Sequence, residues 1–424
     1  MSKQHDARIR TARQRPTWLT PLKVLPSASC LLCLTLAADI ALADEDNSSM
    51  LRDPLDGRFD ASEYLAENAF GFLPVPVIIT DPAVDGGLGM FGLFFHESEE
   101  DAAARKEAMR ESEDAGKYLL PPSVSAVGAA YTGNESWLVG GGYLGFFREG
   151  KLRYQGGGGY GDVDLDFFGF GELEFDRPIS LNTQAFAVVQ SLKSRLGNSR
   201  AYIGIAQRFV SADLAPSNLG FVDDLPLPPD IVDEIRDRLT QGVTTSALGL
   251  QFEYDSRDNF FSPRQGYRYS FDYYAYRDWL GSDIDYDAWT LSGLNYWRLS
   301  DKFRLGLRIQ ADIADASDLL PPFATPSMNL RGIQIGRYQG NYVGVAESEF
   351  TWQIDSRWSV LAFAGIGRAA NSFDEFQDAE NRITRGGGFR YLIARRYGFD
   401  MGIDIARGPE DTIWYIQAGS AWGR

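Results

Sequence analysis

The chain has 424 residues, 44% of them hydrophobic, and a formal net charge of −17. So acidic a chain argues against binding to nucleic acid, whose phosphates select basic surfaces. No run approaches the roughly 18 apolar residues of a membrane helix, so the way left to cross a bilayer is a closed β-barrel, which also satisfies every backbone N–H and C=O. The 44 glycines and 13% aromatic residues, together with an ordinary overall hydrophobic content, suit a barrel. Only every second residue of its strands faces lipid, so the chain as a whole need not be strongly hydrophobic.

The first residues have the pattern of an export signal. A basic leader precedes the apolar segment 30–38, and Ala41-Leu42-Ala43 forms a small-x-small cleavage site. We therefore expect residues 1–43 to be a signal peptide, residues 44–73 a short periplasmic segment and residues 74–424 the barrel. Residues 1–43 contain both cysteines and six Lys/Arg against two Asp/Glu, so their removal leaves a formal charge of −21. Disulfides and thiol metal ligands are then excluded.

Most of the remaining chain consists of segments of about ten residues in which apolar and polar side chains alternate. In residues 303–312, for example, Phe303, Leu305 and Leu307 share one face, and every charged residue lies on the other. A soluble β-sandwich would show the same alternation. The many aromatic residues on the apolar face and the export signal favour a face that contacts lipid. We expect an all-β fold, a sixteen-stranded antiparallel transmembrane β-barrel, with strands near residues 86–96, 123–132, 136–147, 151–161, 166–175, 183–193, 201–210, 244–255, 266–276, 285–298, 303–314, 343–353, 358–368, 384–393, 398–406 and 412–422.

An even number of strands puts both ends of the barrel on one side, expected to be the periplasm. The turns expected on that side are short, namely residues 133–135, 196–199, 300–302 and 355–357. The segments expected on the outside are long, namely residues 97–122, 211–243, 315–342 and 369–383. We expect the last strand, residues 412–422, to place Trp414 and Trp422 on its outward face.

Three places carry motifs that alternation alone does not require. The turn of residues 255–266, D-S-R-D-N-F-F-S-P-R-Q-G, lies between the eighth and ninth expected strands and contains Asp255, Arg257, Asp258, Pro263 and Gly266. The loop before the twelfth strand contains Arg331-Gly332-Ile333, and that strand contains Ser348-Glu349-Phe350. The chain ends with Gly419 and Trp422, three residues apart.

In this order the motifs resemble those of the BamA/TamA superfamily of outer-membrane barrels, also called the bacterial surface antigen family. The resemblance covers about residues 244–422. It implies that the loop containing Arg331 folds back into the lumen, that residues 255–266 form the turn between strands eight and nine, and that Gly419 and Trp422 belong to a C-terminal recognition signal. It also implies action without a cofactor, through first and last strands that pair weakly and open sideways to a client strand.

Two features depart from the family pattern. Residues 363–367 read F-A-G-I-G, so Gly365 occupies the place of the aspartate in the family motif F-x-D-x-G. In the family that acid receives the loop arginine, which leaves the partner of Arg331 open. Residues 44–73 are also too few for a POTRA domain, the periplasmic module that receives clients in relatives.

Strand twelve offers an alternative partner for Arg331. Its alternation places Glu347 and Glu349 on the face opposite Phe350 and Trp352, and hence toward the lumen. An arginine carried into a barrel can be held by a charge-assisted pair with a carboxylate. We therefore expect Arg331 to pair with Glu349 or Glu347. The alternatives are an exposed loop charge and a direct role in transport.

Three classes of function remain in competition. The first is assembly or translocation of outer-membrane polypeptides without POTRA domains; the second is a passive channel or structural surface antigen. The third, an outer-membrane hydrolase, would rest on His96, expected at the outer end of strand one, and Ser98. Nothing supplies the third group that such chemistry needs, so we expect no enzyme, no metal and no cofactor. The expected location is the Gram-negative outer membrane, with lipid, lipopolysaccharide and possible client polypeptides as partners.

Overall fold

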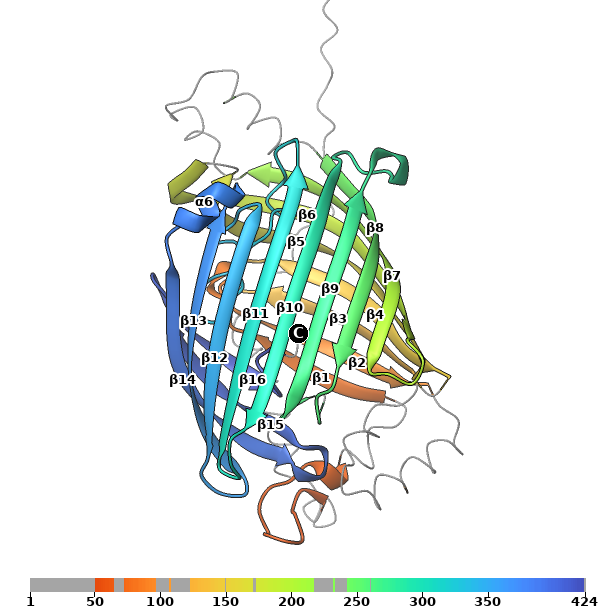
Figure 1. The fold of residues 1–424 in the computed structure, drawn as a ribbon, viewed down its shortest axis with the longest axis vertical. Coiled ribbons are helices and arrows are strands. Elements are labelled where there is room, and N and C mark those ends of the chain that lie inside the picture. Colours follow the sequence, from red (N-terminus) through yellow and green to blue (C-terminus); the bar gives the residue numbers. More distant parts are fainter. Residues whose placement is uncertain are drawn as a thin grey trace, which may run out of the picture. The chain divides into compact units, whose positions relative to one another are not determined.

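The computed structural model describes residues 50–64, 72–96, 123–148, 150–170, 173–216, 242–259 and 261–422, with 107 and 232 alone between them. The expected signal peptide lies outside these residues. The described chain folds into one sixteen-stranded antiparallel sheet that follows chain order from the first strand to the last (Figure 1). Among the described residues, no helix is long and apolar enough to span a membrane. The expected sixteen-stranded antiparallel barrel is confirmed.

Each strand pairs with its neighbours in sequence, from β1 with β2 to β15 with β16. The strands are β1 (Phe72–Ile79), β2 (Gly87–Phe95), β3 (Ser123–Thr132), β4 (Trp137–Phe147), β5 (Leu152–Phe170), β6 (Leu173–Arg195), β7 (Ala201–Pro216), β8 (Gly242–Asp255), β9 (Gly266–Tyr276), β10 (Tyr286–Arg298), β11 (Phe303–Ala316), β12 (Tyr342–Gln353), β13 (Trp358–Ala370), β14 (Arg382–Ala394), β15 (Phe399–Arg407) and β16 (Thr412–Ala418).

The ladder stops at β1 and β16. Among the described strands, no backbone pairing joins these two, and we call the gap between them the seam. The end of the barrel at which β1 begins and β16 ends is called the terminal rim. The opposite end, which carries residues 317–341 and the short helix α6 (Phe373–Asp378), is called the loop rim.

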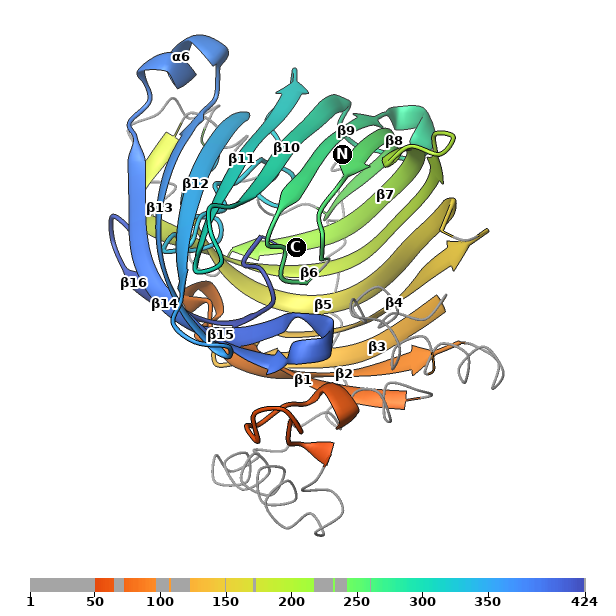
Figure 2. The ribbon, with the colours of Figure 1, turned by 60° about the horizontal axis from the view of Figure 1, so that its bottom comes forward.

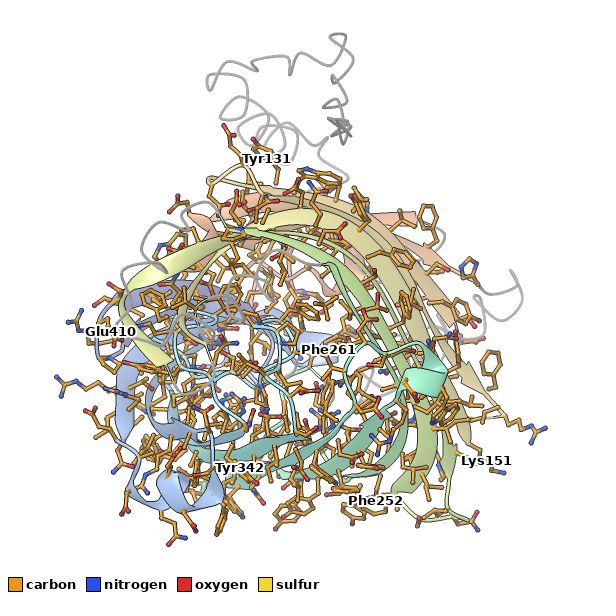
Figure 3. The ribbon with its side chains drawn as sticks, turned by 90° about the horizontal axis from the view of Figure 1, so that it is seen from above. Tyr131, Lys151, Phe252, Phe261, Tyr342 and Glu410 are labelled. Carbon is orange, nitrogen blue, oxygen red and sulfur yellow. The ribbon has the colours of Figure 1, made fainter. Side chains whose placement is uncertain are left out.

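Alternation sorts side chains between the outer face and the lumen as expected. On β8 and β9 the apolar set is exposed on the outer face, whereas the polar residues between them are mostly buried on β8 and half-buried on β9. Figure 3, which looks along the barrel, shows Phe252 and Tyr131 pointing away from the ring of strands. The exposed outer set on these and neighbouring strands includes Leu250, Phe252, Tyr269, Phe271, Ile309, Phe350 and Trp352.

The expected number of strands was reached through two errors that cancel. The structure has a strand, β1, before the first one expected, and the expected barrel boundary at residue 74 moves to Phe72. The expected strand 166–175 does not exist as one element, since Phe170 at the end of β5 pairs with Leu173 at the start of β6. Pro74 and Pro76 hid β1, because proline usually argues against a strand; an edge strand can accept it where the missing N–H faces away from the partner.

These two errors also assign the first connections between strands to the wrong end of the barrel. The end of β2 and the start of β3 lie at the terminal rim, so the connection between them, residues 97–122, was assigned to the wrong side; apart from residue 107 it lies outside the described residues. The turn 133–135 belongs to the loop rim. Both had been expected on the opposite side. His96 follows β2 at the terminal rim, so its expected place at the outer end of strand one was also wrong. From β6 onward the expected sides agree with the strand order.

Candidate functional site in the lumen

The loop between β11 and β12 folds into the ring of strands (Figure 2). An isolated bridge between Ser327 and Gln339 closes its base into a narrow hairpin. Its apolar residues are buried and pack on two inward residues of β12, forming the cluster Met328, Leu330, Ile333, Val343 and Val345. Burial of this apolar surface holds the loop against the wall, and Arg331 lies between the buried Leu330 and Ile333.

Arg331 is bound by carboxylates from two strands. Its Nε donates to Glu347 Oε1 at 2.6 Å, and its Nη2 also pairs with that oxygen. Its Nη1 lies 2.9 Å from Glu349 Oε2 and 2.8 Å from Asp404 Oδ2. Arg331 is 7% exposed, and the side chains of Glu347 and Asp404 are fully buried. The guanidinium thus uses its whole planar edge, an arrangement that lysine cannot reproduce.

Aromatic rings complete the enclosure of the guanidinium. Arg331 Cζ lies 3.6 Å from the centroid of Phe363 on β13. The indole of Trp422 donates from Nε1 to Glu347 Oε1 at 3.1 Å. A cation over an aromatic face is attracted by the ring quadrupole, and more strongly where water is excluded. Strand β13 therefore contributes a ring to the site rather than a charge.

A second arginine shares one of the carboxylates. Arg390 on β14 donates to both oxygens of Asp404 on β15, at 2.5 and 2.8 Å. Two arginines therefore face three carboxylates, counting Glu347 and Glu349, so the cluster carries a formal charge of −1. Removing an arginine raises this negative charge, whereas neutralising one carboxylate removes it.

The loop is also tied to β15 and β16 on the C-terminal side of the seam. Gly332, at φ +93°, donates its N–H to the hydroxyl of Tyr415 at 2.9 Å. A Cβ on Gly332 would lie 3.0 Å from the backbone nitrogen of Gly408. Both the positive φ and this close approach require glycine. Farther along the loop, the Tyr338 hydroxyl bonds to Glu410 in the turn between β15 and β16.

Gly365 shows why β13 supplies no acid. A Cβ at this position would lie 2.8 Å from Thr384 Oγ1 and 3.1 Å from Leu330 Cδ2. The space that an aspartate would need is filled by the loop and by β14. Asp404 on β15, one strand beyond β14, supplies a carboxylate to Arg331 instead.

The turn of residues 255–266 is built around its own side chains. Arg257 forms a two-point pair with Asp255, from Nε at 3.0 Å and Nη2 at 2.8 Å. Asp258 Oδ1 accepts the N–H groups of Arg264 and Gln265, the residues after Pro263. Gly266 has φ +107°, and a Cβ there would lie 2.5 Å from Ser256 O. These contacts give Asp255, Arg257, Asp258 and Gly266 a local structural role in the turn.

The same turn receives the end of the chain. The N–H of Ser420 donates to Phe261 O at 2.7 Å, and the N–H of Gly419 donates to Asp400 O at 2.7 Å. With φ +74° at Gly419, the chain leaves the direction of β16 and turns into the lumen. Trp422 is 6% exposed and packs with Leu294 and Tyr296. The expectation of a strand through residue 422 with Trp422 facing outward is therefore wrong, because glycine lets the strand end at Ala418.

Three of the residues that build the site were not identified from the sequence as its members. Asp404 and Arg390 lie in strands that were not expected to contact the loop, and Trp422 was noted only as part of a C-terminal signal. Asp404 pairs in register with Gly388, two residues before Arg390. Opposite charges in nearly facing positions of paired strands were the available signal.

Nothing in the described residues builds a nucleophilic site around His96. Its Nε2 lies 2.7 Å from Ser125 Oγ, and Ser98 lies outside the described residues. No group of three or more His, Cys, Asp or Glu side chains in the described part of the chain could hold a metal ion.

Comparisons with known proteins agree with this geometry. A family model described as the Omp85 superfamily domain matches residues 165–405. Among solved structures, BamA from Haemophilus ducreyi lacking POTRA domains 1–3 matches with a TM-score of 0.55 at 11% identity, covering 82% of this chain and 70% of that chain. CdiB from Escherichia coli matches with a TM-score of 0.52 at 11% identity, covering 82% of this chain and 62% of that one. No curated protein matches the sequence.

Proposed function

Because the chain belongs to the Omp85 superfamily, we propose that it is an outer-membrane barrel that assists assembly or translocation of polypeptides through its seam. The observation that carries this proposal is the absence of backbone pairing between β1 and β16 among the described strands. An unpaired strand edge is a template for another strand, whose backbone N–H and C=O groups would complete the ladder. The terminal rim then faces the periplasm, and the expected partners are lipid, lipopolysaccharide and client polypeptides.

The C-terminal side of the seam is also the side at which the lumen site is built. The loop pairs through Arg331 with Asp404 on β15, and through Gly332 with Tyr415 on β16. Trp422, beyond β16, bonds to Glu347, which holds the same arginine. We therefore infer that the Arg331 site fixes the position of the closing strands, so that the open edge is presented in one geometry.

A photo-crosslinking experiment tests the proposal. A photoreactive residue is placed at Ile416 on β16, at Val77 on β1 or, as a control far from the seam, at Phe252 on β8; all three side chains are exposed. The barrel in liposomes is then given an unfolded outer-membrane polypeptide. We expect crosslinks from Ile416 and Val77 and none from Phe252. Equal crosslinking at all three positions, or none at all, would contradict the proposal.

The alternative function is a passive channel, and the filled lumen bears on it. A loop, its arginine cluster and Trp422 all occupy the interior, which opposes a wide steady pore. Single-channel conductance of the barrel and of Arg331→Ala separates the two functions. Large, steady conductance in both would favour the channel.

A further inference from the structure

Outside the lumen, the segment of residues 51–62 is docked on the terminal rim; we call it the strap. Figure 2 shows it, in red, beside the turn that follows β14. A backbone bridge between Arg52 and Phe59 folds it into a compact loop, and Gly57, at φ +68°, closes the bend. The strap is separate from the loop site and from every motif that the family resemblance identifies.

Three aspartates of the strap bind one arginine of the terminal rim. Arg357, in the turn between β12 and β13, is fully buried. Its Nε donates to Asp56 Oδ2 at 2.7 Å, its Nη1 to Asp60 Oδ2 at 2.5 Å, and its Nη2 to Asp53 Oδ2. A single guanidinium thereby satisfies carboxylates from three places in a loop of eight residues.

The strap is organised to receive that arginine. Each aspartate uses its Oδ1 to accept the N–H two residues ahead, at Leu55, Arg58 and Ser62, at 2.8, 2.9 and 2.7 Å. This leaves each Oδ2 for the guanidinium. Such Asx turns fix the side chains before docking, so less conformational entropy is lost when the strap binds.

Further contacts extend the docking to the last residues of β14 and to the turn that follows them. The N–H of Ala61 donates to Ile393 O at 2.6 Å, and the Tyr391 hydroxyl donates to Phe59 O at 2.7 Å. The N–H of Arg395 donates to Asp60 Oδ2 at 3.0 Å, and its side chain also pairs with Asp53. The attachment therefore spans two turns on the C-terminal side of the seam.

The strap buries charge and exposes apolar side chains. Leu55 is 77% exposed and Phe59 45%, whereas Asp53 and Asp60 are each 4% exposed. A segment held by the hydrophobic effect would show the opposite pattern. The attachment depends on Arg357, because without it the buried Asp60 carboxylate would lose the arginine side chain that pairs with it, which is strongly unfavourable.

We propose that the strap is a clasp across the seam, holding the N-terminal edge of the barrel to its C-terminal strands. Seven residues separate Tyr64, the last described residue after the strap, from Phe72, the first residue of β1. Eight residue steps span at most about 29 Å. The docked strap therefore limits how far β1 can move from β12–β15 at the terminal rim. The clasp regulates opening of the seam. This regulatory role rests on the proposed function, whereas the restraint on β1 does not.

Spin labels measure this directly, without a client polypeptide. Cys30 and Cys33 are replaced by serine, and one label pair is placed at Val77 on β1 and Ile416 on β16. A second pair, at Leu250 and Ile309 within the wall, is the internal control, and a single label at Leu55 reports docking of the strap. The variants are Arg357→Ala and the milder Asp60→Asn. Arg58→Ala is the matched control, because it removes only an exposed pair between Arg58 of the strap and Asp355 of the turn between β12 and β13.

In Arg357→Ala and Asp60→Asn we expect the Leu55 label to become mobile and the distances across the seam to broaden. The wall pair and the Arg58→Ala variant should stay unchanged. A mobile strap with an unaltered seam would overturn the clasp, and so would an immobile Leu55 label in both variants. Because no client is present, a barrel that fails to insert clients could still show the clasp, and the reverse also holds.

Discussion

Two arginines of this barrel are each held by three carboxylates, yet the surroundings differ. Arg331 lies in the lumen between buried Leu330 and Ile333, with a phenylalanine ring against its guanidinium. Arg357 lies on the terminal rim, and the segment that binds it leaves Leu55 exposed. The first segment is held by apolar burial together with charge, the second mainly by charge and hydrogen bonds. Loss of the arginine should therefore have different consequences in the two segments.

The largest expected effect comes from removing either arginine. Arg331→Ala leaves the buried Glu347 without its paired arginine, which typically costs about 3–5 kcal/mol. Arg357→Ala does the same to Asp60, while Asp404 and Asp53 each keep a second arginine, Arg390 or Arg395. We expect Arg331→Ala to lower the free energy of unfolding in urea. A spin label at Ile335 should stay immobile, because the buried apolar residues of the loop still pack against β12. Arg357→Ala should instead release the strap with a smaller loss of global stability. The exposed Arg298, paired with Asp301, gives an Arg298→Ala control. Release of both segments would refute the distinction.

A second prediction concerns the position at which the family places an acid. Gly365→Asp should lower stability by about 2–4 kcal/mol, because it adds both a clash with Thr384 Oγ1 and a carboxylate close to Glu347. Gly365→Ala introduces the same Cβ without the charge, and we expect about 1–2 kcal/mol from it. Comparing the urea unfolding of the two variants separates the steric cost of the Cβ from the cost of the added carboxylate. Equal values would mean that β13 tolerates the charge and that only space excludes it.

A smaller effect is expected at the end of the chain. Trp422→Phe keeps a ring against Leu294 and Tyr296 but removes the N–H bonded to Glu347. Loss of one hydrogen bond to a charged group should cost about 1–3 kcal/mol. Trp414→Phe, on the exposed outer face of β16, is the matched control and should change the unfolding midpoint little. If both variants behave alike, the indole N–H does not support the lumen site.

The sequence was sufficient to locate most wall strands and their antiparallel order, because alternation is a local property of each wall segment, but it reached sixteen strands only because two errors cancelled. It was also sufficient to find Arg331 and its inward-facing candidates Glu347 and Glu349. It missed β1, because prolines mask an edge strand, and it placed a separate strand at residues 166–175, where β5 and β6 meet, because alternation continues there. Which strands carry the partners of a loop depends on how far the loop penetrates, and no local pattern encodes that depth.

The strap was missed for a related reason. Asp53, Asp56 and Asp60 lie in an acidic stretch that resembles any solvated segment, and Arg357 lies some 300 residues later, in a turn. The spacing of the aspartates with Gly57 predicts Asx turns, but only the fold brings Arg357 to them. Long-range ion clusters of this kind need three-dimensional information, even where each half is locally ordered.

The smallest predicted effect is the response of the strap to acid. Hydrogen bonds from the N–H groups of Arg357 and Trp358, and then from the Arg58 side chain, lower the pKa of Asp355 from 3.8 to about 2. The Arg357 side chain and the Arg58 N–H also lower the pKa of Asp56, while hydrogen bonds from the Arg395 side chain and the Leu55 N–H outweigh burial and lower that of Asp53. A carboxylate with a depressed pKa contributes stability that is complete above its unfolded value and is lost as the pH falls through the folded one. The Leu55 label should therefore stay immobile from neutral pH to about pH 4 and gain mobility from there toward about pH 2. In Arg357→Ala it should be mobile throughout. Release centred above about pH 5 would contradict a strap held by aspartates of lowered pKa.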